Sequence, residues 1–301
     1  MPTLTIPGRA RRRAAALACA GLAAWLSVTV TPAQQADPAR RAAPGDAPLA
    51  WAVYDAAPFM IRQGADRDRG IFDRIRHLLD ERLAGAPQAT LTAPLPRILA
   101  LLRDGAELCF IGAAQTRERE AFALFSVPVA MYYPLRIVVK DAGRSRFAPA
   151  GPLSLAALLA DRSLRTSTLR DRALGEPIDA LLRRDPPTRF HSETGEAFHM
   201  LLAGRLDYLL EFSPITAYAQ SRHTRDGDIV ALPFVEAPPP ILARVMCPRT
   251  DWGRRQIARI DDVLRVERPA SAYRDIVEAW SDEADRPTIR RAFDAVLLTS
   301  R

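Results

Sequence analysis

Apolar residues along this chain alternate between two spacings, one typical of buried strands and one typical of amphipathic helices. The run LAWAVY at 49–54 is short and apolar throughout, which predicts a strand. Residues 70–83 then carry apolar side chains at three- and four-residue intervals, which predicts a helix. A strand at 88–92, a helix at 95–103 and a strand beginning at Leu108 continue the series. This β-α-β-α-β order is typical of a parallel sheet with helices on its faces.

A second alternating series follows a strand predicted at 135–140. It consists of helices at 153–159, 175–184, 194–203 and 214–221 and strands at 164–166, 188–191, 208–212 and 229–234. We expect it to form a second sheet of similar size. A strand at 241–246 and helices at 251–266, 270–280 and 286–298 follow. The sequence therefore predicts an α/β protein of two lobes, each a mixed, mostly parallel sheet flanked by helices.

The boundaries of the two lobes follow from where the chain passes between the series. We expect lobe 1 to comprise residues 48–132 and 241–301, and lobe 2 to comprise residues 135–238. The segments 133–135 and 239–241 would then join the lobes and form a hinge.

The first 36 residues have the features of a secretory signal peptide. Four arginines within residues 9–13 precede an apolar run of small residues at 14–30, and Thr31-Pro32-Ala33 provides a small-residue site for cleavage. Residues 37–47 are rich in Pro, Ala and Arg and predict a linker. A membrane anchor is the alternative, because the run of seventeen residues is near the lower limit for a span. Its many alanines make it weakly hydrophobic, so we expect export into the periplasm.

Removal of residues 1–36 also changes the charge balance. The chain has 42 basic and 35 acidic residues, and four of the basic ones lie in this segment, which leaves 38 against 35, or about +3. This small excess is spread out without interleaved aromatic residues, so we expect no nucleic-acid partner. Glycine-rich nucleotide motifs and the serine-hydrolase motif are absent from the sequence, and we expect no cofactor.

Cys109 and Cys247, each in a short apolar run, are the two cysteines that remain after cleavage. On neighbouring strands in an oxidising compartment they could form a disulfide, provided that their Cα atoms lie within about 7 Å. Two buried free thiols are the alternative, and the sequence leaves both open. Two cysteines are too few for a zinc site.

A group of acids and histidines is the one place where a metal site is conceivable. It contains His191, Glu193, Glu196 and His199. Glu196 and His199 would share a helix face, but no second motif completes a ligand set. We favour a helix capped by Ser192 or Thr194, with acids that complement its N-terminus, and expect no metal.

Three strand ends carry polar groups that could contact a ligand. The apolar run from Leu108 leads through small residues to Thr116 and Arg119, where free N–H groups and a guanidinium could hold an anion. An ordinary turn with Thr116 as the N-cap is the alternative. The hydroxyl-rich segment RTSTLR at 165–170 could hold a carboxylate or a phosphate, or be a plain turn. Glu211 ends another strand, where it could meet an ammonium group or face solvent.

Three short motifs, in the right order, resemble family 3 solute-binding proteins of the type II periplasmic-binding-protein architecture. Pro58-Phe59 resembles the family's aromatic-Pro-Phe turn after the first strand. Thr116-Arg117-Glu118-Arg119, followed by Phe125-Ser126-Val127-Pro128, resembles its T-x-x-R and F-S-x-P segment. Gly204-Arg205-Leu206-Asp207 resembles its G-R-x-D before a strand. The resemblance covers about residues 50–296.

The resemblance implies a set of ligand-binding residues. Arg119 would grip a ligand carboxylate, Thr116 and a turn at 166–168 would add donors, and Glu211 would receive an α-amino group. The expected binding residues are Tyr54, Phe59, Thr116, Arg119, Thr166, Thr168, Arg170 and Glu211. Ala56 stands where the family's stacking aromatic is usual, and Glu211 is one position early.

The resemblance also implies a function. We expect a monomeric periplasmic solute-binding protein that captures a small, amino-acid-like carboxylate between hinged lobes. It would serve transport or sensing through an ABC permease or a membrane sensor encoded elsewhere. An enzyme on the same scaffold, similar to a cyclic-acid dehydratase, is the alternative, with Glu193, Glu196 or Glu211 as its acid.

Overall fold

The structure is a computed structural model that describes residues 49–300 except 84–88, 148–151, 224–227, 282 and 284. The signal peptide and the linker expected at 1–36 and 37–47 lie outside the described residues. The expected lobe boundaries stay a prediction.

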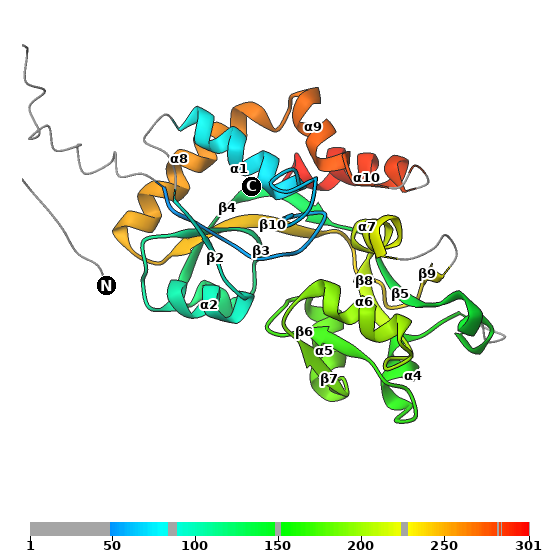
Figure 1. Ribbon diagram of the computed structural model, residues 1–301. Coiled ribbons are helices and arrows are strands. Elements are labelled where there is room, and N and C mark those ends of the chain that lie inside the picture. Colours follow the sequence, from blue (N-terminus) through cyan, green and yellow to red (C-terminus); the bar gives the residue numbers. More distant parts are fainter. Residues whose placement is uncertain are drawn as a thin grey trace, which may run out of the picture. The chain divides into compact units, whose positions relative to one another are not determined.

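The first sheet has five strands in the order β2-β1-β3-β10-β4 (Figure 1). These strands are β1 (Trp51–Val53), β2 (Thr90–Thr92), β3 (Cys109–Ala114), β4 (Ala123–Tyr132) and β10 (Ile241–Pro248). β1 pairs in parallel with β2 and β3, whereas β10 pairs antiparallel with β3 and β4. The strand that returns last in the sequence therefore lies inside the sheet.

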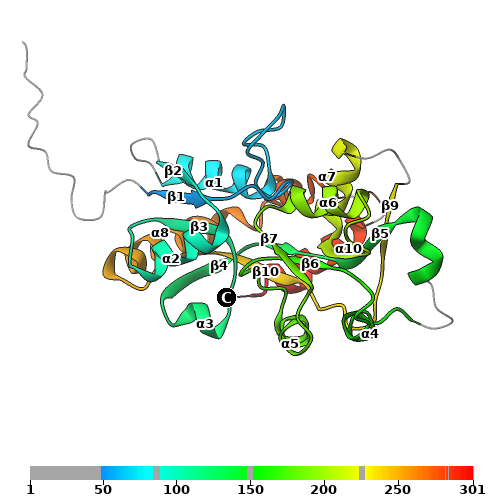
Figure 2. The same ribbon diagram turned by 60° about the horizontal axis from the view of Figure 1, so that its bottom comes forward.

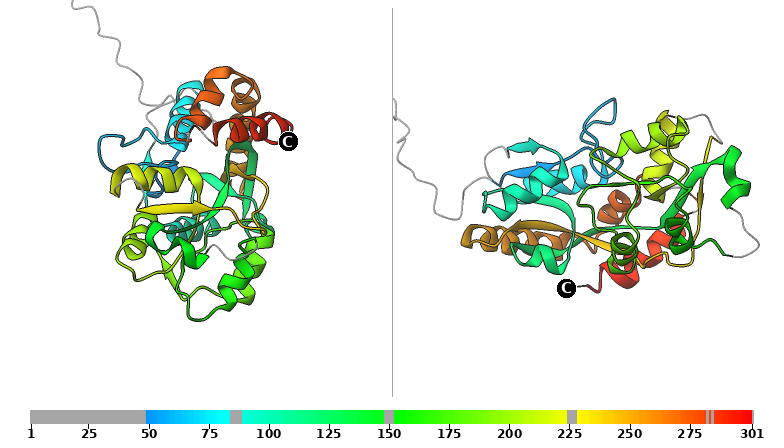
Figure 3. Two further views of the ribbon diagram at one scale, coloured as in Figure 1. Left: turned by 90° about the vertical axis from the view of Figure 1, so that its right-hand side faces the viewer. Right: turned by 90° about the horizontal axis from the view of Figure 1, so that it is seen from below.

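Seven helical segments accompany this first sheet. They are α1 (Ile71–Arg82), α2 (Leu95–Arg103), α3 (Arg117–Glu120), α8 (Asp251–Glu267), α9 (Ser271–Glu278), α10 (Arg286–Ala292) and the π-helical η2 (Phe293–Leu297). Figure 1 shows α1 on one side of the sheet and α2 on the other. In the left view of Figure 3, α1, α8, α9 and α10 (cyan, orange and red) gather on one side, opposite the green helices of the second group.

The second group of elements contains two small sheets. β5 (Leu135–Lys140) pairs antiparallel with β8 (Leu209–Phe212) and β9 (Ile229–Leu232), and β6 (Ser167–Leu169) pairs in parallel with β7 (Arg189–His191). The accompanying helices are η1 (Asp141–Phe147), α4 (Leu155–Ala160), α5 (Glu176–Arg184), α6 (Thr194–Leu202) and α7 (Ser213–His223). Figure 2 shows α4 and α5 on one side of these strands and α6 and α7 on the other.

The expectation of a second sheet as large as the first is wrong. The predicted strand at 164–166 lies three residues further on, and the strands of this group divide into a three-stranded and a two-stranded sheet, with side-chain hydrogen bonds of Thr166 and Thr188 beside β6. The Thr166 hydroxyl donates to the Tyr208 carbonyl at 3.0 Å, and the Thr188 hydroxyl accepts the Thr166 N–H at 3.1 Å. Three of the seven described strand pairings are parallel, so the sheets are mixed, with fewer parallel pairs than expected.

Cys109 on β3 and Cys247 on β10 form a disulfide with a Cα–Cα distance of 4.4 Å. Both cysteines are fully buried between strands that pair in the middle of the first sheet. Of the two alternatives left open by the sequence, the structure has the paired one.

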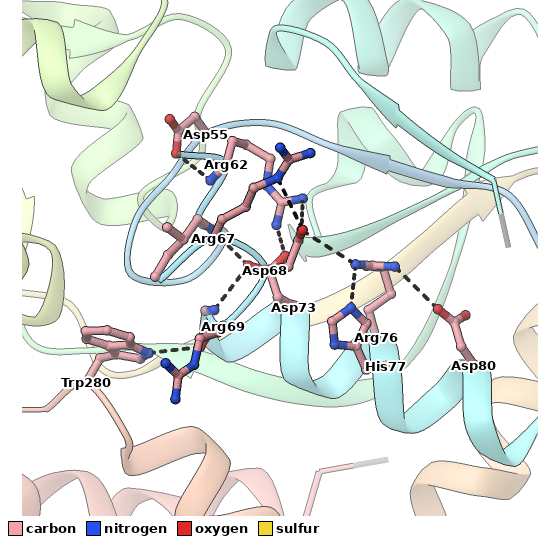
Figure 4. A network of polar contacts seen from close by, with 12 residues as sticks. Asp55, Arg62, Arg67, Asp68, Arg69, Asp73, Arg76, His77, Asp80 and Trp280 are labelled. Atoms are coloured by element: carbon pink, nitrogen blue, oxygen red, sulfur yellow. Dashed lines mark hydrogen bonds and ion pairs between the residues drawn. The ribbon is translucent and has the colours of Figure 1, made fainter. Parts of the chain in front are cut away.

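A polar network fixes the loop at 61–69 against the start of α1 (Figure 4). The buried Asp73 carboxylate accepts the N–H groups of Ile61 at 2.8 Å and Gly70 at 3.1 Å, and it pairs with the Arg62 guanidinium. Asp68 holds the other side of that guanidinium at 2.8 Å. The network positions the loop that borders the second group, where Asp66 pairs with Arg222 of α7.

Candidate ligand-binding cleft

Arg119 lies where the end of β3 meets the second group of elements. Thr116 accepts the Arg119 N–H at 3.3 Å as the N-cap of α3, which fixes the start of this short helix. The Arg119 side chain is buried, and its guanidinium donates to the carbonyls of Ala114 and Asp171, each at 2.8 Å. Ala114 belongs to β3 and Asp171 follows β6, so Arg119 bridges the two groups.

The charge of Arg119 has only neutral partners within hydrogen-bonding distance. Among the described residues, no carboxylate oxygen lies within 4.0 Å of its nitrogens. Burial lowers the pKa of the guanidinium, and the neighbouring Tyr54 and Tyr132 oppose that shift. A buried cation bound to carbonyls alone is an unusual arrangement, because buried charges are normally paired with opposite ones.

An ion pair forms the opposite wall of the cleft. The Arg172 guanidinium binds both oxygens of Glu211 in a fork, at 2.7 and 2.8 Å. It also lies over the Phe212 ring, 4.9 Å from its centroid. Burial on its own lowers the pKa of Arg172, but the charge and hydrogen bonds of Glu211 outweigh it, so the pKa lies above its usual range.

Aromatic rings fill the space between the two arginines. Tyr132 at the end of β4 stacks on Phe212 with centroids 5.1 Å apart, and it packs against Phe59 at 4.7 Å. Tyr54 meets Phe110 at 5.9 Å. Burial raises the pKa of both tyrosines, so their hydroxyls stay protonated.

Gly112 explains why small residues follow the apolar run of β3. Its φ of +97° is strained for any residue with a side chain, and a Cβ here would lie 2.5 Å from the Phe72 ring. The Tyr132 hydroxyl donates to its carbonyl at 2.7 Å. The glycine therefore lets two aromatic side chains approach the backbone beside the cleft.

Two small cavities remain in the cleft. One of about 20 Å³ is lined by both Arg119 and Arg172, together with Tyr54 and Tyr132. The other, of about 30 Å³, is lined by Arg172 and Glu211 among others. Because a water needs about 10–15 Å³ of such space, each has room for one or two waters and no more. The side chains themselves fill the cleft in this conformation.

The structure brings together only part of the expected binding set. Tyr54 and Arg119 line the 20 Å³ cavity, and Glu211 and Thr168 line the 30 Å³ cavity. Phe59 lies behind Tyr132 and is fully buried. Their roles in ligand binding stay predictions.

Three other expected residues are engaged elsewhere. Thr116 caps α3, and Thr166 donates its hydroxyl to Tyr208. The turn expected at 166–168 is wrong, since β6 occupies Ser167–Leu169 and pairs with β7. Arg170 is exposed and stacks on the exposed Phe190 at 5.1 Å.

Arg172 is the residue that the sequence did not reveal. Strand β6 ends three residues later than predicted, so Arg172 fell within an apparent loop between strand and helix. Asp171 has a φ of +59° and turns the chain there, which directs its carbonyl to Arg119 while Arg172 reaches Glu211. The dipeptide Asp171-Arg172, one residue beyond a hydroxyl-rich strand, was the available signal.

Three of the four acids and histidines around α6 lie outside this cleft. Glu193, Glu196 and His199 line a separate hollow of about 1000 Å³ together with Asp55 and Tyr218. No group of three His, Cys, Asp or Glu side chains that could hold a metal occurs among the described residues.

His191 itself points inward. It is buried with its Nδ1 2.8 Å from the Ser167 hydroxyl, and burial lowers its pKa to about 4. The nearby Glu211 opposes this shift. His191 is therefore neutral at physiological pH and belongs to the packed wall behind Arg172.

Comparison with known proteins gives matches only in structure. No family model matches the sequence, and no curated protein matches it. An amino acid ABC transporter substrate-binding protein from Streptococcus pneumoniae, bound to L-arginine, superposes with a TM-score of 0.61 at 18% identity, covering 77% of this chain and 92% of that one. This chain has the two-lobed periplasmic-binding-protein fold.

Two further structures extend the range of proteins that share the fold. The ancestral amino acid-binding protein AncCDT-1, a precursor of cyclohexadienyl dehydratase, has a TM-score of 0.61 at 17% identity, covering 78% of this chain and 96% of that one. A histidine kinase sensor domain has a TM-score of 0.60 at 16% identity, with coverages of 77% and 95%. The expected resemblance to family 3 solute-binding proteins is thus confirmed at the level of the fold. In the described part of the chain, none of the helices has the length and apolar character of a membrane span.

Proposed function

We propose that this protein captures a small carboxylate-bearing ligand between its two lobes, with Arg119 as the anchoring cation. The observation that carries the proposal is the buried guanidinium of Arg119, which has only two carbonyl oxygens as partners among the described residues. A carboxylate that bound it in a fork would supply the missing opposite charge. Solved proteins of the same fold include amino acid-binding proteins.

Access to Arg119 requires the lobes to separate. One of its two partners, the Asp171 carbonyl, comes from the second group of elements, and the remaining cavities have room for water only. We propose lobes at 48–132 with 241–301 and at 135–238, hinged at 133–135 and 239–241. A ligand would then stabilise the closed form through its higher affinity for that form.

The site of action would be the periplasm. We propose that residues 1–36 direct export and that 37–47 form a linker, and the buried Cys109–Cys247 disulfide fits an oxidising compartment. Acting as a monomer, the protein would pass its ligand to an ABC permease or report it to a membrane sensor. A permease gene beside this one would favour transport, and a sensor kinase gene would favour sensing.

The enzyme alternative has less support at this cleft. Glu211 is held by Arg172, and Glu193 and Glu196 line the separate hollow at α6. A dehydratase needs an acid that can give or take a proton at the ligand. Turnover of a cyclic acid that is lost in Glu211→Gln would favour the enzyme.

Thermal-shift and calorimetric titrations with a panel of small carboxylates and amines test the proposal. We expect the midpoint of unfolding to rise with at least one carboxylate, and the rise to disappear in Arg119→Met. Arg117→Met is the matched control, since Arg117 lies in the same short helix but is exposed. An absence of any shift, or equal shifts in wild type and Arg119→Met, would refute the role of Arg119.

A further inference from the structure

We infer that Arg172 is a built-in cation in the subsite where an amino acid would place its ammonium group, so that the ligand of this cleft is a carboxylate without an α-amino group. This inference rests on the proposed function, since it concerns the same ligand. It depends on three side chains, those of Arg119, Arg172 and Glu211.

Glu211 has little capacity left for an ammonium group. Both of its oxygens accept from Arg172, at 2.7 and 2.8 Å, and one of them also accepts the Phe212 N–H at 2.7 Å. A carboxylate offers about four acceptor positions, so three are taken. The acid is also nearly inaccessible, with 6% of its side chain exposed. An α-amino group would have to displace Arg172 in order to bind here.

The segment that supplies Arg172 places a carbonyl oxygen on Arg119 and a cation on Glu211, the two positions that an amino acid would occupy with its carboxylate and its ammonium. The Asp171 carbonyl oxygen accepts from Arg119, where a ligand carboxylate would bind. The next residue places its guanidinium on Glu211, where an ammonium would bind. The left-handed conformation of Asp171, with φ at +59°, lets consecutive residues reach both sites. The protein thus fills both subsites with its own groups.

The two subsites differ in how readily a ligand can take them over. A carboxylate that replaces the Asp171 carbonyl exchanges a neutral partner of Arg119 for a charged one, which strengthens the hydrogen bonds. An ammonium that replaces Arg172 exchanges one ion pair for another and leaves Arg172 buried without its partner. Only the first exchange is favourable, so the carboxylate subsite is open to a ligand and the ammonium subsite is closed.

The net charge of the cleft leads to the same ligand class. Arg119 and Arg172 contribute two positive charges, and Glu211 one negative charge. A monocarboxylate neutralises the remaining charge, whereas a zwitterion leaves it in place and brings its ammonium close to Arg172. The rings of Tyr54, Phe110 and Tyr132 beside Arg119 provide an apolar surface for the body of the ligand.

Matched pairs of acids test the inference by calorimetric titration. The probes are 3-phenylpropanoate against phenylalanine and butanoate against 2-aminobutanoate, which differ only in the α-amino group. We expect wild type to bind the plain acid at least tenfold more tightly in each pair that binds. In Arg172→Met, which frees Glu211, we expect the preference to reverse in favour of the amino acid. Arg165→Met is the matched control, because Arg165 pairs with Asp207 on the surface of the same lobe.

A second variant keeps the test decisive should Arg172→Met fail to fold. Glu211→Gln leaves two arginines without an acid in the cleft, so succinate should gain at least tenfold in affinity relative to butanoate. Tighter binding of the amino acids to wild type would overturn the inference, and so would an unchanged preference in both Arg172→Met and Glu211→Gln. In either case the proposed function would stand if binding still depended on Arg119. If wild type bound no carboxylate, or bound carboxylates as well as Arg119→Met does, both the inference and the proposed function would be refuted.

Discussion

The Cys109–Cys247 disulfide allows a quantitative prediction about stability. It closes a loop with a sequence separation of 138 residues, which contains β4 to β9 and so the whole second group of elements. The chain-entropy relation gives about 5 kcal/mol at 25 °C for a loop of this length, and measured disulfides typically contribute about 2–4 kcal/mol. We therefore expect reduction to lower the free energy of unfolding by about 3–5 kcal/mol.

Urea unfolding with and without dithiothreitol measures this loss. Tryptophan fluorescence reports mainly on the first sheet and its helices, because Trp51 lies in β1 and Trp252 in α8, whereas residues 135–238 contain no tryptophan. Reduction should also raise the denaturant slope, since an unfolded chain without the cross-link exposes more surface. The double variant Cys109→Ala/Cys247→Ala separates the cross-link from the volume of the thiols. A loss below about 1 kcal/mol with an unchanged slope would refute the reasoning.

Three further predictions concern buried groups. Asp73→Asn keeps the size of the side chain but deprives Arg62 of its buried partner, so we expect urea unfolding to show a loss of about 3–5 kcal/mol, and a loss below about 1 kcal/mol would contradict it. Gly112→Ala should lower the free energy of unfolding, measured by thermal unfolding, by at least about 2 kcal/mol, because a Cβ there meets an aromatic ring. Gly64 also has a positive φ but open space around it, so Gly64→Ala should lower it less. Equal losses in the two variants would contradict the clash. The pKa of His191 lies at about 4 in the folded protein, below its usual 6.5, so between these values the unfolded chain binds a proton that the folded protein does not. The contribution of neutral His191 to the free energy of unfolding is therefore fully present above pH 6.5, and about 3 kcal/mol of it is lost as the pH falls to 4. Urea titrations across that range should show a weaker pH dependence in His191→Gln, and an equal dependence would contradict the assignment.

The helices beside the first sheet were predictable where their apolar spacing is unambiguous, whereas β4 (Ala123–Tyr132), the longest strand of that sheet, was not predicted. Residues 95–103 show helical periodicity from end to end, and the structure has α2 at Leu95–Arg103. In the second group of elements, β7 and β8 lie within one residue of their predicted ranges, and the error concerns β6. In the segment around RTSTLR, both LRT at 164–166 and STL at 167–169 can form a short strand. Hydrogen bonds of Thr166 to distant residues decide between them, and these bonds leave no local pattern.

The candidate site divides in the same way. Arg119 follows a recognisable strand and Glu211 lies in another, so short motifs indicate both residues. Arg172 meets its partner across 39 residues and only because Asp171 adopts a positive φ. The predicted role of Glu211 as an ammonium acceptor depended on that unseen neighbour. A pairwise contact between distant segments is the kind of information that spacing and composition do not carry.

The Arg172–Glu211 pair is better explained by ligand choice than by stability. Removing two charges from water is expensive, and apolar side chains of similar volume often stabilise a protein as well as a buried ion pair does. The pair nevertheless stands in the cleft, over Phe212 and opposite Arg119, where an apolar replacement would lower the polarity of the wall. With the pair present, the acid that would accept an ammonium is neutralised and the cleft keeps one net positive charge. An ion pair that adds little to folding can in this way determine whether an amino acid or a plain carboxylate binds.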